Sequence, residues 1–87
     1  MESLAYYQAV VDNHPDYENA WMAQSKIIKT YKSMVVDSDL TKSEAEILIE
    51  EGYRKIIEMF PNSPVAEKAR REVKIYEKIK ADKEALR

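Results

Sequence analysis

One stretch of the sequence has the outline of a metal site, and it runs from residue 37 to residue 48 and reads DSDLTKSEAEIL. A calcium loop of this length needs glycine at its sixth position for a sharp turn and glutamate at its twelfth position as a bidentate ligand. These positions hold Lys42 and Leu48 here. We therefore expect no calcium site in this stretch.

Side chains for nucleophilic or metal chemistry are scarce. His14 is the only histidine and cysteine does not occur, so the chain has no Ser-His-Asp triad, Cys-His dyad or pair of histidine ligands. Gly52 is the only glycine, which excludes a glycine-rich phosphate loop. The carboxylates of Glu50 and Glu51 are better explained as a solvated helix face than as a general acid and base. We expect no enzyme activity, no metal and no cofactor, and we expect His14 to pack half-buried at a helix end.

A polar stripe suggests binding rather than catalysis. Its residues recur at helical spacing, turned by roughly 120° from the apolar residues of the same predicted helix. The stripe consists of Asn19, Met22, Lys26, Lys29 and Ser33. Methionine adapts to irregular apolar partners and lysine ammonium groups complement carboxylates, so we predict a partner-binding surface here. The alternative is an ordinary solvated helix face, and Tyr6, which lies off the apolar stripe of its own helix, is a similar candidate.

Composition limits the fold that can position these residues. The chain has 87 residues, of which 45% are hydrophobic, and this is enough for one small core. A single glycine, three prolines and 34% charged residues are typical of an all-helical protein rather than a sheet protein. No apolar run approaches the roughly 18 residues that span a bilayer, and residues 1 to 11 lack the pattern of a signal peptide. The absence of cysteine suits cytosol and periplasm equally.

Charge is distributed unevenly along the chain. Residues 1 to 64 hold six basic and eleven acidic side chains, a net charge of −5, whereas residues 65 to 87 hold eight basic and five acidic ones, a net charge of +3. The basic end is either a solvated helix face or a surface that attracts an acidic partner or the acidic body of a second copy. The sequence pI near 5.4 argues against nucleic-acid binding.

The most informative pattern is an internal repeat with a period of 46 residues. The segment YYQAVVDNHPDYENAWMA, which begins at Tyr6, returns as GYRKIIEMFPNSPVAEKA, which begins at Gly52. The matched pairs are Tyr7 and Tyr53, Val10 and Ile56, Val11 and Ile57, Asp12 and Glu58, Pro15 and Pro61, Ala20 and Ala66, and Ala23 and Ala69. Periods of about 20–50 residues with helical spacing indicate solenoids, which present surfaces to other proteins.

Apolar periodicity predicts four antiparallel helices in one domain, residues 1–87. The first covers about residues 2 to 13 and ends before Pro15, and the second covers about residues 17 to 35. The third begins at Thr41 or Ser43, each followed three residues later by glutamate, as in a capping box. The fourth begins at the Ser63-Pro64 pair, a good N-cap followed by proline.

The sequence also predicts how Trp21, Tyr53, Gly52 and the end of the fourth helix pack. Trp21 and Tyr53 are expected in the core because they lie on apolar helix stripes. Gly52 falls inside the third predicted helix, where glycine costs roughly 1 kcal/mol relative to alanine, so we expect a neighbouring helix to approach closely there. Beyond Ile79 the fourth helix has few apolar residues, which leaves its last turns exposed or covered by something outside this chain.

The repeated pattern resembles the tetratricopeptide repeat, in particular the variant of bacterial cell-envelope proteins such as outer-membrane assembly lipoproteins and the periplasmic coordinator of the Tol-Pal system. The matching residues are Tyr7, Val10, Pro15, Ala20, Trp21 and Ala23 in one unit, and Tyr53, Ile56, Pro61, Ala66 and Ala69 in the other. The chain departs from the family's period of about 34 residues. It also has Ser25 and Arg71 where the family has glycine.

The resemblance implies an all-α superhelix fragment in which one complete helix pair is flanked by two half-repeats. It implies a non-catalytic scaffold that binds a segment of a partner protein, in a periplasmic or outer-membrane-associated assembly, with the first helix of each unit lining the groove. Two alternatives stay open. The chain is a self-association module that docks through its fourth helix, or it is a three- or four-helix bundle whose sequence happens to repeat.

Overall fold

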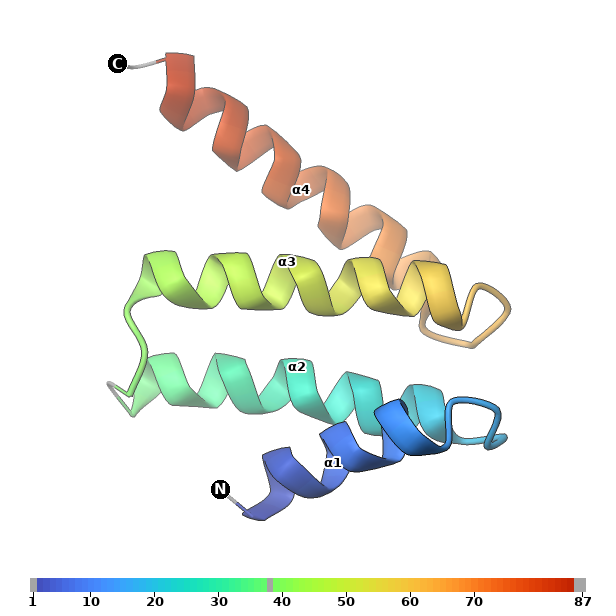
Figure 1. The fold of residues 1–87 in the computed structure, drawn as a ribbon. Coiled ribbons are helices and arrows are strands. Elements are labelled where there is room, and N and C mark those ends of the chain that lie inside the picture. Colours follow the sequence, from blue (N-terminus) through green and yellow to red (C-terminus); the bar gives the residue numbers. More distant parts are fainter. Residues whose placement is uncertain (1, 38, 86–87) are drawn as a thin grey trace.

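The computed structural model describes residues 2–37 and 39–85, and these residues form four α-helices and no strand (Figure 1). The helices are α1 (Glu2–Asn13), α2 (Ala20–Val36), α3 (Lys42–Met59) and α4 (Ala66–Ala85). Successive helices run in opposite directions in Figure 1. The predicted all-α fold with four antiparallel helices is confirmed. Ser38, in the predicted turn between the second and third helices, lies outside the described residues.

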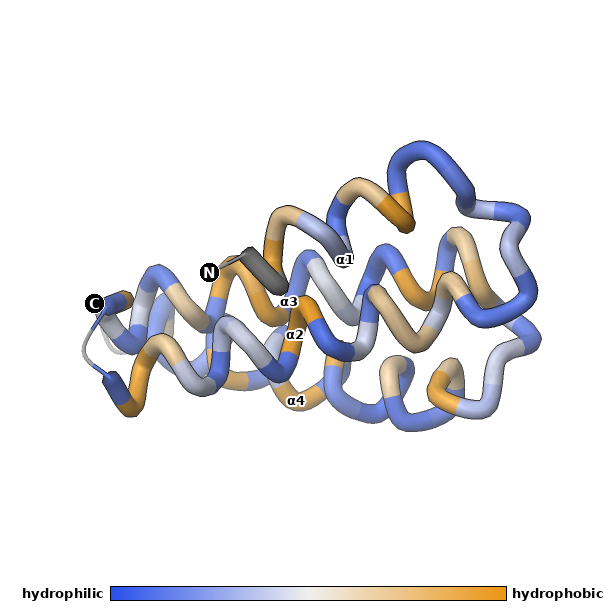
Figure 2. The backbone as a smooth tube through the Cα atoms, turned by 90° about the horizontal axis from the view of Figure 1, so that it is seen from below, coloured by the Kyte–Doolittle hydropathy of each residue, from blue (hydrophilic) through white to orange (hydrophobic). Residues whose placement is uncertain are grey.

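Each helix packs against its neighbours in the sequence. Among the described residues α2 contacts α1 and α3, and α3 contacts α4, but α1 and α4 do not contact each other. Figures 1 and 2 show α1 and α4 on opposite sides of the α2–α3 pair. The molecule is accordingly flat, with extents of 43 × 29 × 17 Å. A closed bundle would bring the first and last helices together, so this open packing does not fit the bundle alternative.

The repeat of the sequence is also a repeat of the backbone. α1 and α3 end at matched residues, Asn13 and Met59, and α2 and α4 begin at matched residues, Ala20 and Ala66. The two corners share three backbone hydrogen bonds, from His14 to Val10 at 2.9 Å, Tyr17 to His14 at 3.0 Å and Ala20 to Tyr17 at 3.0 Å in the first corner, and from Phe60 to Ile56 at 2.8 Å, Ser63 to Phe60 at 3.1 Å and Ala66 to Ser63 at 3.2 Å in the second. The same local sequence therefore folds into the same corner twice.

These corners delay the start of α2 and α4 relative to the prediction. We expected helices from about residue 17 and from Ser63, but both begin three residues later because the corner satisfies its amides by tight turns instead of helical bonds. Ser63 does not cap α4, since its hydroxyl donates to the Phe60 carbonyl at 2.8 Å. The predicted starts were wrong for this reason.

Two hydrophobic clusters hold the helices together. The larger lies among α2, α3 and α4 and consists of Ile28, Ala45, Ile49, Tyr53, Ile56, Ala66, Ala69 and Val73. The smaller lies between α1 and α2 and consists of Val11, Ala23 and Ile27. Figure 2 shows hydrophobic positions alternating with hydrophilic ones along the helices. Tyr53 lies in the core as predicted, whereas Trp21 is only half-buried, so its placement in the core was wrong.

At Gly52 the helices α2 and α3 approach each other closely. A Cβ atom added at Gly52 would lie 2.7 Å from Cγ1 of Ile28. The buried Gln24 side chain donates from Nε2 to the Gly52 carbonyl at 3.1 Å, which adds a hydrogen bond at the same point. The prediction that a neighbouring helix explains this glycine is confirmed.

A capping box begins α3. The Thr41 hydroxyl accepts from the Glu44 amide at 3.2 Å, and Glu44 Oε1 accepts from the Thr41 amide at 3.1 Å. The Thr41 amide and the Thr41 hydroxyl, at 2.9 Å, both donate to Glu44 Oε1, and these two bonds hold the pKa of Glu44 below its ordinary value because they favour the ionised carboxylate. Thr41, rather than Ser43, is therefore the N-cap. By contrast, Asn19 precedes α2 without a side-chain capping bond.

Candidate partner-binding groove

The predicted polar stripe lies on the surface of α2. All five of its residues are exposed, and Lys26, Lys29 and Ser33 line a shallow hollow of about 240 Å³ together with Tyr7 and Thr30. Asn19 and Met22 lie nearer the start of the helix, outside this hollow. The structure thus brings three of the five residues together. Contact of the five residues with a partner stays a prediction.

Lysines dominate the charge of α2. The helix carries Lys26, Lys29 and Lys32 and no acidic residue between its ends. The Lys26 ammonium lies 5.8 Å from the ring centroid of Tyr7, and the Lys32 ammonium lies 5.3 Å from that of Tyr53. Tyr7 and Tyr53 are matched by the repeat, so the equivalent aromatic rings of α1 and α3 each hold one lysine of α2 by a cation–π contact.

Lys32 forms a hydrogen bond in addition to its cation–π contact. Its ammonium donates to the Tyr53 hydroxyl at 2.9 Å. This hydrogen bond raises the pKa of Lys32 above its ordinary value, against the opposing effect of partial burial. Lys32 is therefore a cation at neutral pH. Burial raises the pKa of the nearby Tyr76 above its ordinary value, although the positive charge of Lys32 works in the other direction.

Between α2 and α4 the surface is hollowed in two places, and Lys32 lines both of them. The cationic hollow, of about 390 Å³, has Lys29, Lys32 and Lys68 around a floor that includes Tyr53 and Ile56. The apolar hollow, of about 380 Å³, is lined by residues that include Lys32, Val35, Lys42, Ile49, Ile75 and Ile79. We call the two hollows together the α2–α4 groove. Volumes of this size are typical of sites that take side chains of a ligand.

The α4 wall of this groove was missed from the sequence, although the repeat contained the signal. Adding the period of 46 residues to the five stripe positions gives Val65, Lys68, Glu72, Ile75 and Ile79. All of these residues line one of the two hollows. The repeat of the stripe therefore forms the α4 wall of this groove. The facing α2 wall consists of Ser25, Ile28, Lys29, Lys32 and Val35, and of these Lys29 belongs to the stripe.

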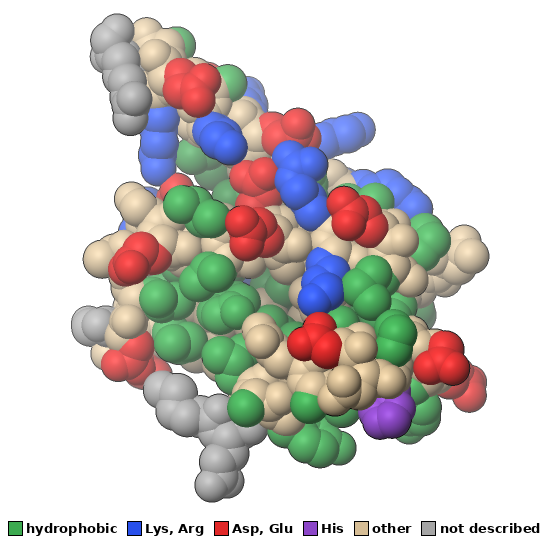
Figure 3. All heavy atoms as spheres, in the orientation of Figure 1, with side chains coloured by type: hydrophobic (Ala, Val, Ile, Leu, Met, Phe, Trp, Pro, Cys, Tyr) green, Lys and Arg blue, Asp and Glu red, His purple; other side chains and the backbone are tan. Residues whose placement is uncertain are grey.

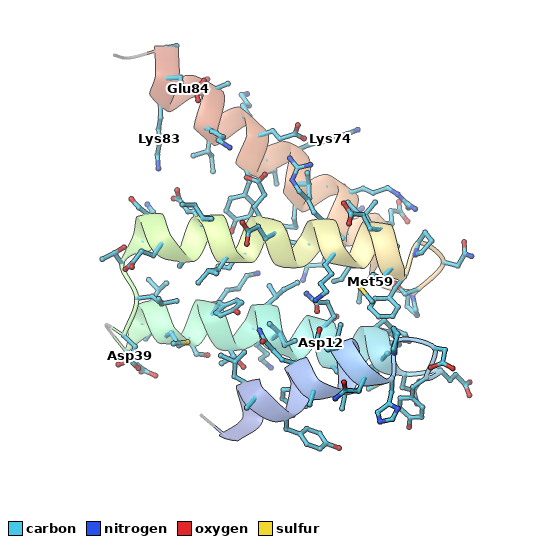
Figure 4. All side chains as sticks on the ribbon, viewed as in Figure 1. Asp12, Asp39, Met59, Lys74, Lys83 and Glu84 are labelled. Atoms are coloured by element: carbon cyan, nitrogen blue, oxygen red, sulfur yellow. The ribbon has the colours of Figure 1, made fainter. Side chains whose placement is uncertain are left out.

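An ion pair crosses the opening between α3 and α4. The Lys83 ammonium lies 2.8 Å from Glu46 Oε2, and in Figure 4 the Lys83 side chain points from α4 toward α3. Glu46 also lines the apolar hollow, so its charge there is already partnered by a cation. Glu72 is the other carboxylate of this hollow. The groove as a whole is therefore richer in lysine than in unpaired carboxylate.

The other residues considered for chemistry are Glu50, Glu51 and His14, and they lie in an ion pair or at the surface. Glu50 accepts from Arg54 Nε at 2.9 Å, and Glu51 is exposed. His14 is also exposed, so its predicted half-burial was wrong. The matched residue, Phe60, packs against the smaller cluster, which is formed by side chains of α1 and α2, whereas no described helix lies beyond α1 to cover His14.

Two further findings concern the described residues. Within residues 2–37 and 39–85 no group of three or more His, Cys, Asp or Glu side chains gathers as a metal site would require. In the same part of the chain no helix combines the length and the hydropathy needed to cross a membrane.

Comparisons of the chain with protein-family models, with curated proteins and with solved structures give no match. What the chain does is therefore inferred from its own residues and their arrangement.

Proposed function

We propose that the chain is a non-catalytic protein–protein interaction module of the tetratricopeptide type, which holds a segment of another protein in the α2–α4 groove. The observation that carries the proposal is the coincidence of repeat and groove. All five α4 equivalents of the stripe positions line the groove, and Lys29 of the α2 stripe lines its opposite wall. A surface that recurs with the repeat is where a solenoid presents contacts to a partner.

The packing of the helices supports this proposal. Contacts between sequence neighbours leave a flat molecule whose α2 and α4 surfaces are not covered by another described helix. Repeat proteins use such extended surfaces for binding. The resemblance of the repeat to envelope proteins extends the proposal to its setting, which is a scaffold within a larger periplasmic or outer-membrane-associated assembly.

Charge reversal on α2 tests the proposed function at Lys29, which lines the α2–α4 groove, and at Lys26, which shares the shallow hollow with Lys29. In Lys26→Glu with Lys29→Glu both side chains are exposed, so the fold should be unchanged. The matched control is Lys74→Glu with Lys78→Glu, which makes the same charge change on exposed positions of α4 outside the groove; in Figure 4 Lys74 points away from α3. We expect pull-down from the native source to lose specific partners with the first variant only. Equal recovery with wild type and both variants would reject the groove assignment.

Self-association is the second candidate, and exposed apolar surface favours it. Val36 is 84% exposed and Ile47 is 60% exposed. Figure 3 shows hydrophobic side chains gathered over α2 and α3, with acidic side chains around them. Light scattering tests this candidate, since a monomer has the chain mass of 10.2 kDa and a dimer twice that value.

Docking of a second copy on the outer face of α4 is disfavoured by the charge of that face. On α2, Gln24 and Ile28 contact α3 at Gly52. Their repeat equivalents on α4 are Arg70 and Lys74, and both are exposed. A second copy that packed on α4 as α3 packs on α2 would have to bury these two cations, which is costly without partners.

A further inference from the structure

Two isoleucines on α4 stand out because the fold leaves both of them partly exposed. Ile75 is 53% exposed and Ile79 is half-buried. The matched positions of α2 hold Lys29 and Ser33, which shows that this face of the helix accepts polar residues. Elsewhere α4 does carry polar residues where it is uncovered, as at Lys74. Packing within the chain does not explain two isoleucines at these positions, whereas contact with an apolar group of a ligand would explain them.

The surroundings of these isoleucines suit a large apolar side chain. Ile75 and Ile79 line the apolar hollow with Val35 and Ile49, from α2 and α3. Its volume of about 380 Å³ exceeds that of one side chain. Lys32 lies at the junction of this hollow with the cationic hollow, so an apolar group and a negative group of the same ligand would lie side by side.

The cationic hollow provides the complementary half. Lys29, Lys32 and Lys68 line it, and no acidic side chain does. Within the described residues neither Lys29 nor Lys68 forms an ion pair with another side chain. Three cations around a partly apolar floor favour carboxylates of a ligand over any neutral group.

The two hollows also set a spacing. Lys29 and Val35 are six residues apart on α2, which corresponds to roughly 9 Å along a helix. An extended peptide covers this distance in about three residues. The geometry therefore relates the apolar group of a ligand to its carboxylates.

We propose that the α2–α4 groove takes an extended acidic segment of a partner protein, in which a large apolar side chain lies between Ile75 and Val35 and carboxylates about three residues away contact Lys29 and Lys68. This inference rests on the proposed function and adds the chemistry of the partner. One end of the groove would contact an apolar side chain and the other end carboxylates, so variants of the two ends should differ in how their binding depends on salt.

Selection from a displayed library of random 12-residue peptides on the full chain tests the inference. Enriched peptides should combine acidic residues with a large apolar residue about three positions away. If no peptide is enriched above background, the proposed function fails together with the inference. If peptides without this combination are enriched, the inference fails while a binding module stands.

Two variant pairs then separate the ends of the groove, with synthetic forms of the enriched peptides as probes in fluorescence anisotropy. Ile75→Ser with Ile79→Ser should weaken binding about tenfold without changing its dependence on salt, since a desolvated apolar contact is lost. Lys29→Glu with Lys68→Glu should also weaken binding about tenfold, and it should flatten the salt dependence because screened charge pairs are lost.

Matched controls show that these losses belong to the groove. Ile47→Ser changes an isoleucine that is 60% exposed outside the α2–α4 groove, and Lys74→Glu with Lys78→Glu repeats the charge change elsewhere on α4. Both controls should bind as wild type does. Binding that is unaffected by the groove variants, or reduced equally by the controls, would overturn the inference.

Discussion

The two corners of the molecule, α1–α2 and α3–α4, have the same backbone path and different burial. Tyr7 is half-buried whereas its match Tyr53 is 5% exposed. The next apolar residues, Val10 and Val11 in α1 and Ile56 and Ile57 in α3, are buried in the opposite order. Val11 and Ile56 are fully buried, at 0% and 1% exposed, but they occupy unmatched positions of the repeat. α1 has one helix to pack against and α3 has two, so local sequence determines the path of the chain and neighbouring helices determine which side chains are buried.

The largest expected difference in stability is between truncation of Ile56 and truncation of its match Val10. Ile56→Ala should destabilise the fold by about 3 to 4 kcal/mol, because the side chain is fully buried in the larger cluster. Val10→Ala should cost about 1 kcal/mol or less, because Val10 is half-buried beside the smaller cluster. Urea unfolding measures both values. Equal losses at the two positions would show that the corners are equivalent in energy as well as in path.

Substitution of Gly52 should likewise destabilise the fold more than substitution of its match Tyr6. Gly52→Ala should destabilise the fold by about 1 to 3 kcal/mol, despite the better helix propensity of alanine, because the added Cβ collides with Ile28. Tyr6→Ala should stay within about 0.5 kcal/mol, since Tyr6 is 66% exposed.

A double variant checks the cause at Gly52. In Ile28→Ala the crowding is removed, so the Gly52→Ala substitution should cost less in that background than alone. An unchanged cost would place the strain somewhere other than at Ile28.

The starts of α2 and α3 give a smaller contrast. Thr41→Ala should cost about 1 kcal/mol because it removes the capping hydroxyl, whereas Asn19→Ala should cost less than half of that, since Asn19 makes no capping bond. Thermal unfolding of the two variants at pH 7 measures the difference, and an equal loss at Asn19 would contradict the assignment of the caps.

The capping box also makes a pH dependence. Because the pKa of Glu44 is lowered in the fold, its stabilising effect is fully present above the unfolded-state value of about 4.3 and is lost as pH falls through the lowered value. Unfolding of wild type and Glu44→Gln should therefore differ at pH 7 and converge in acid. A difference that persists at the lowest pH would mean that the carboxylate charge is not involved.

The smallest effect is expected on α2. Lys26→Glu with Lys29→Glu should change the free energy of unfolding by about 0.5 kcal/mol or less, because both side chains are exposed. The cation–π contact of Lys26 with Tyr7 is also exposed and contributes little. A loss of several kcal/mol would show that these lysines support the fold, and the pull-down comparison could then not be interpreted as partner binding.

Much of the fold was predictable because its signals are local. The proline corners and the Thr41 capping box depend on residues within a few positions of one another, and the repeat is visible by comparing the sequence with itself. The starts of α2 and α4 were not predicted correctly, because the amino-acid composition of the corners does not show that their amides form turn bonds instead of helical bonds. Burial of Trp21 and His14 was misjudged because it depends on which helices lie alongside.

The groove shows the same division. Helical spacing within α2 correctly placed Lys26, Lys29 and Ser33 on one face, but of these three residues Lys29 alone lines the α2–α4 groove. Its α4 wall required knowing that matched faces of the repeat point to the same side of the molecule. The pairing of Lys32 with Tyr53 had no sequence signal at all, since 21 positions separate the two residues.

Packing between sequence neighbours has a consequence for how the chain folds. Contacts that link each helix to the next have low contact order, and such chains fold on the timescale of microseconds to milliseconds. We expect the α2–α3 pair, joined at Gly52 and by part of the larger cluster, to form first. α1 is attached through the few residues of the smaller cluster, so its amides should exchange with solvent through a local opening that leaves the other three helices folded.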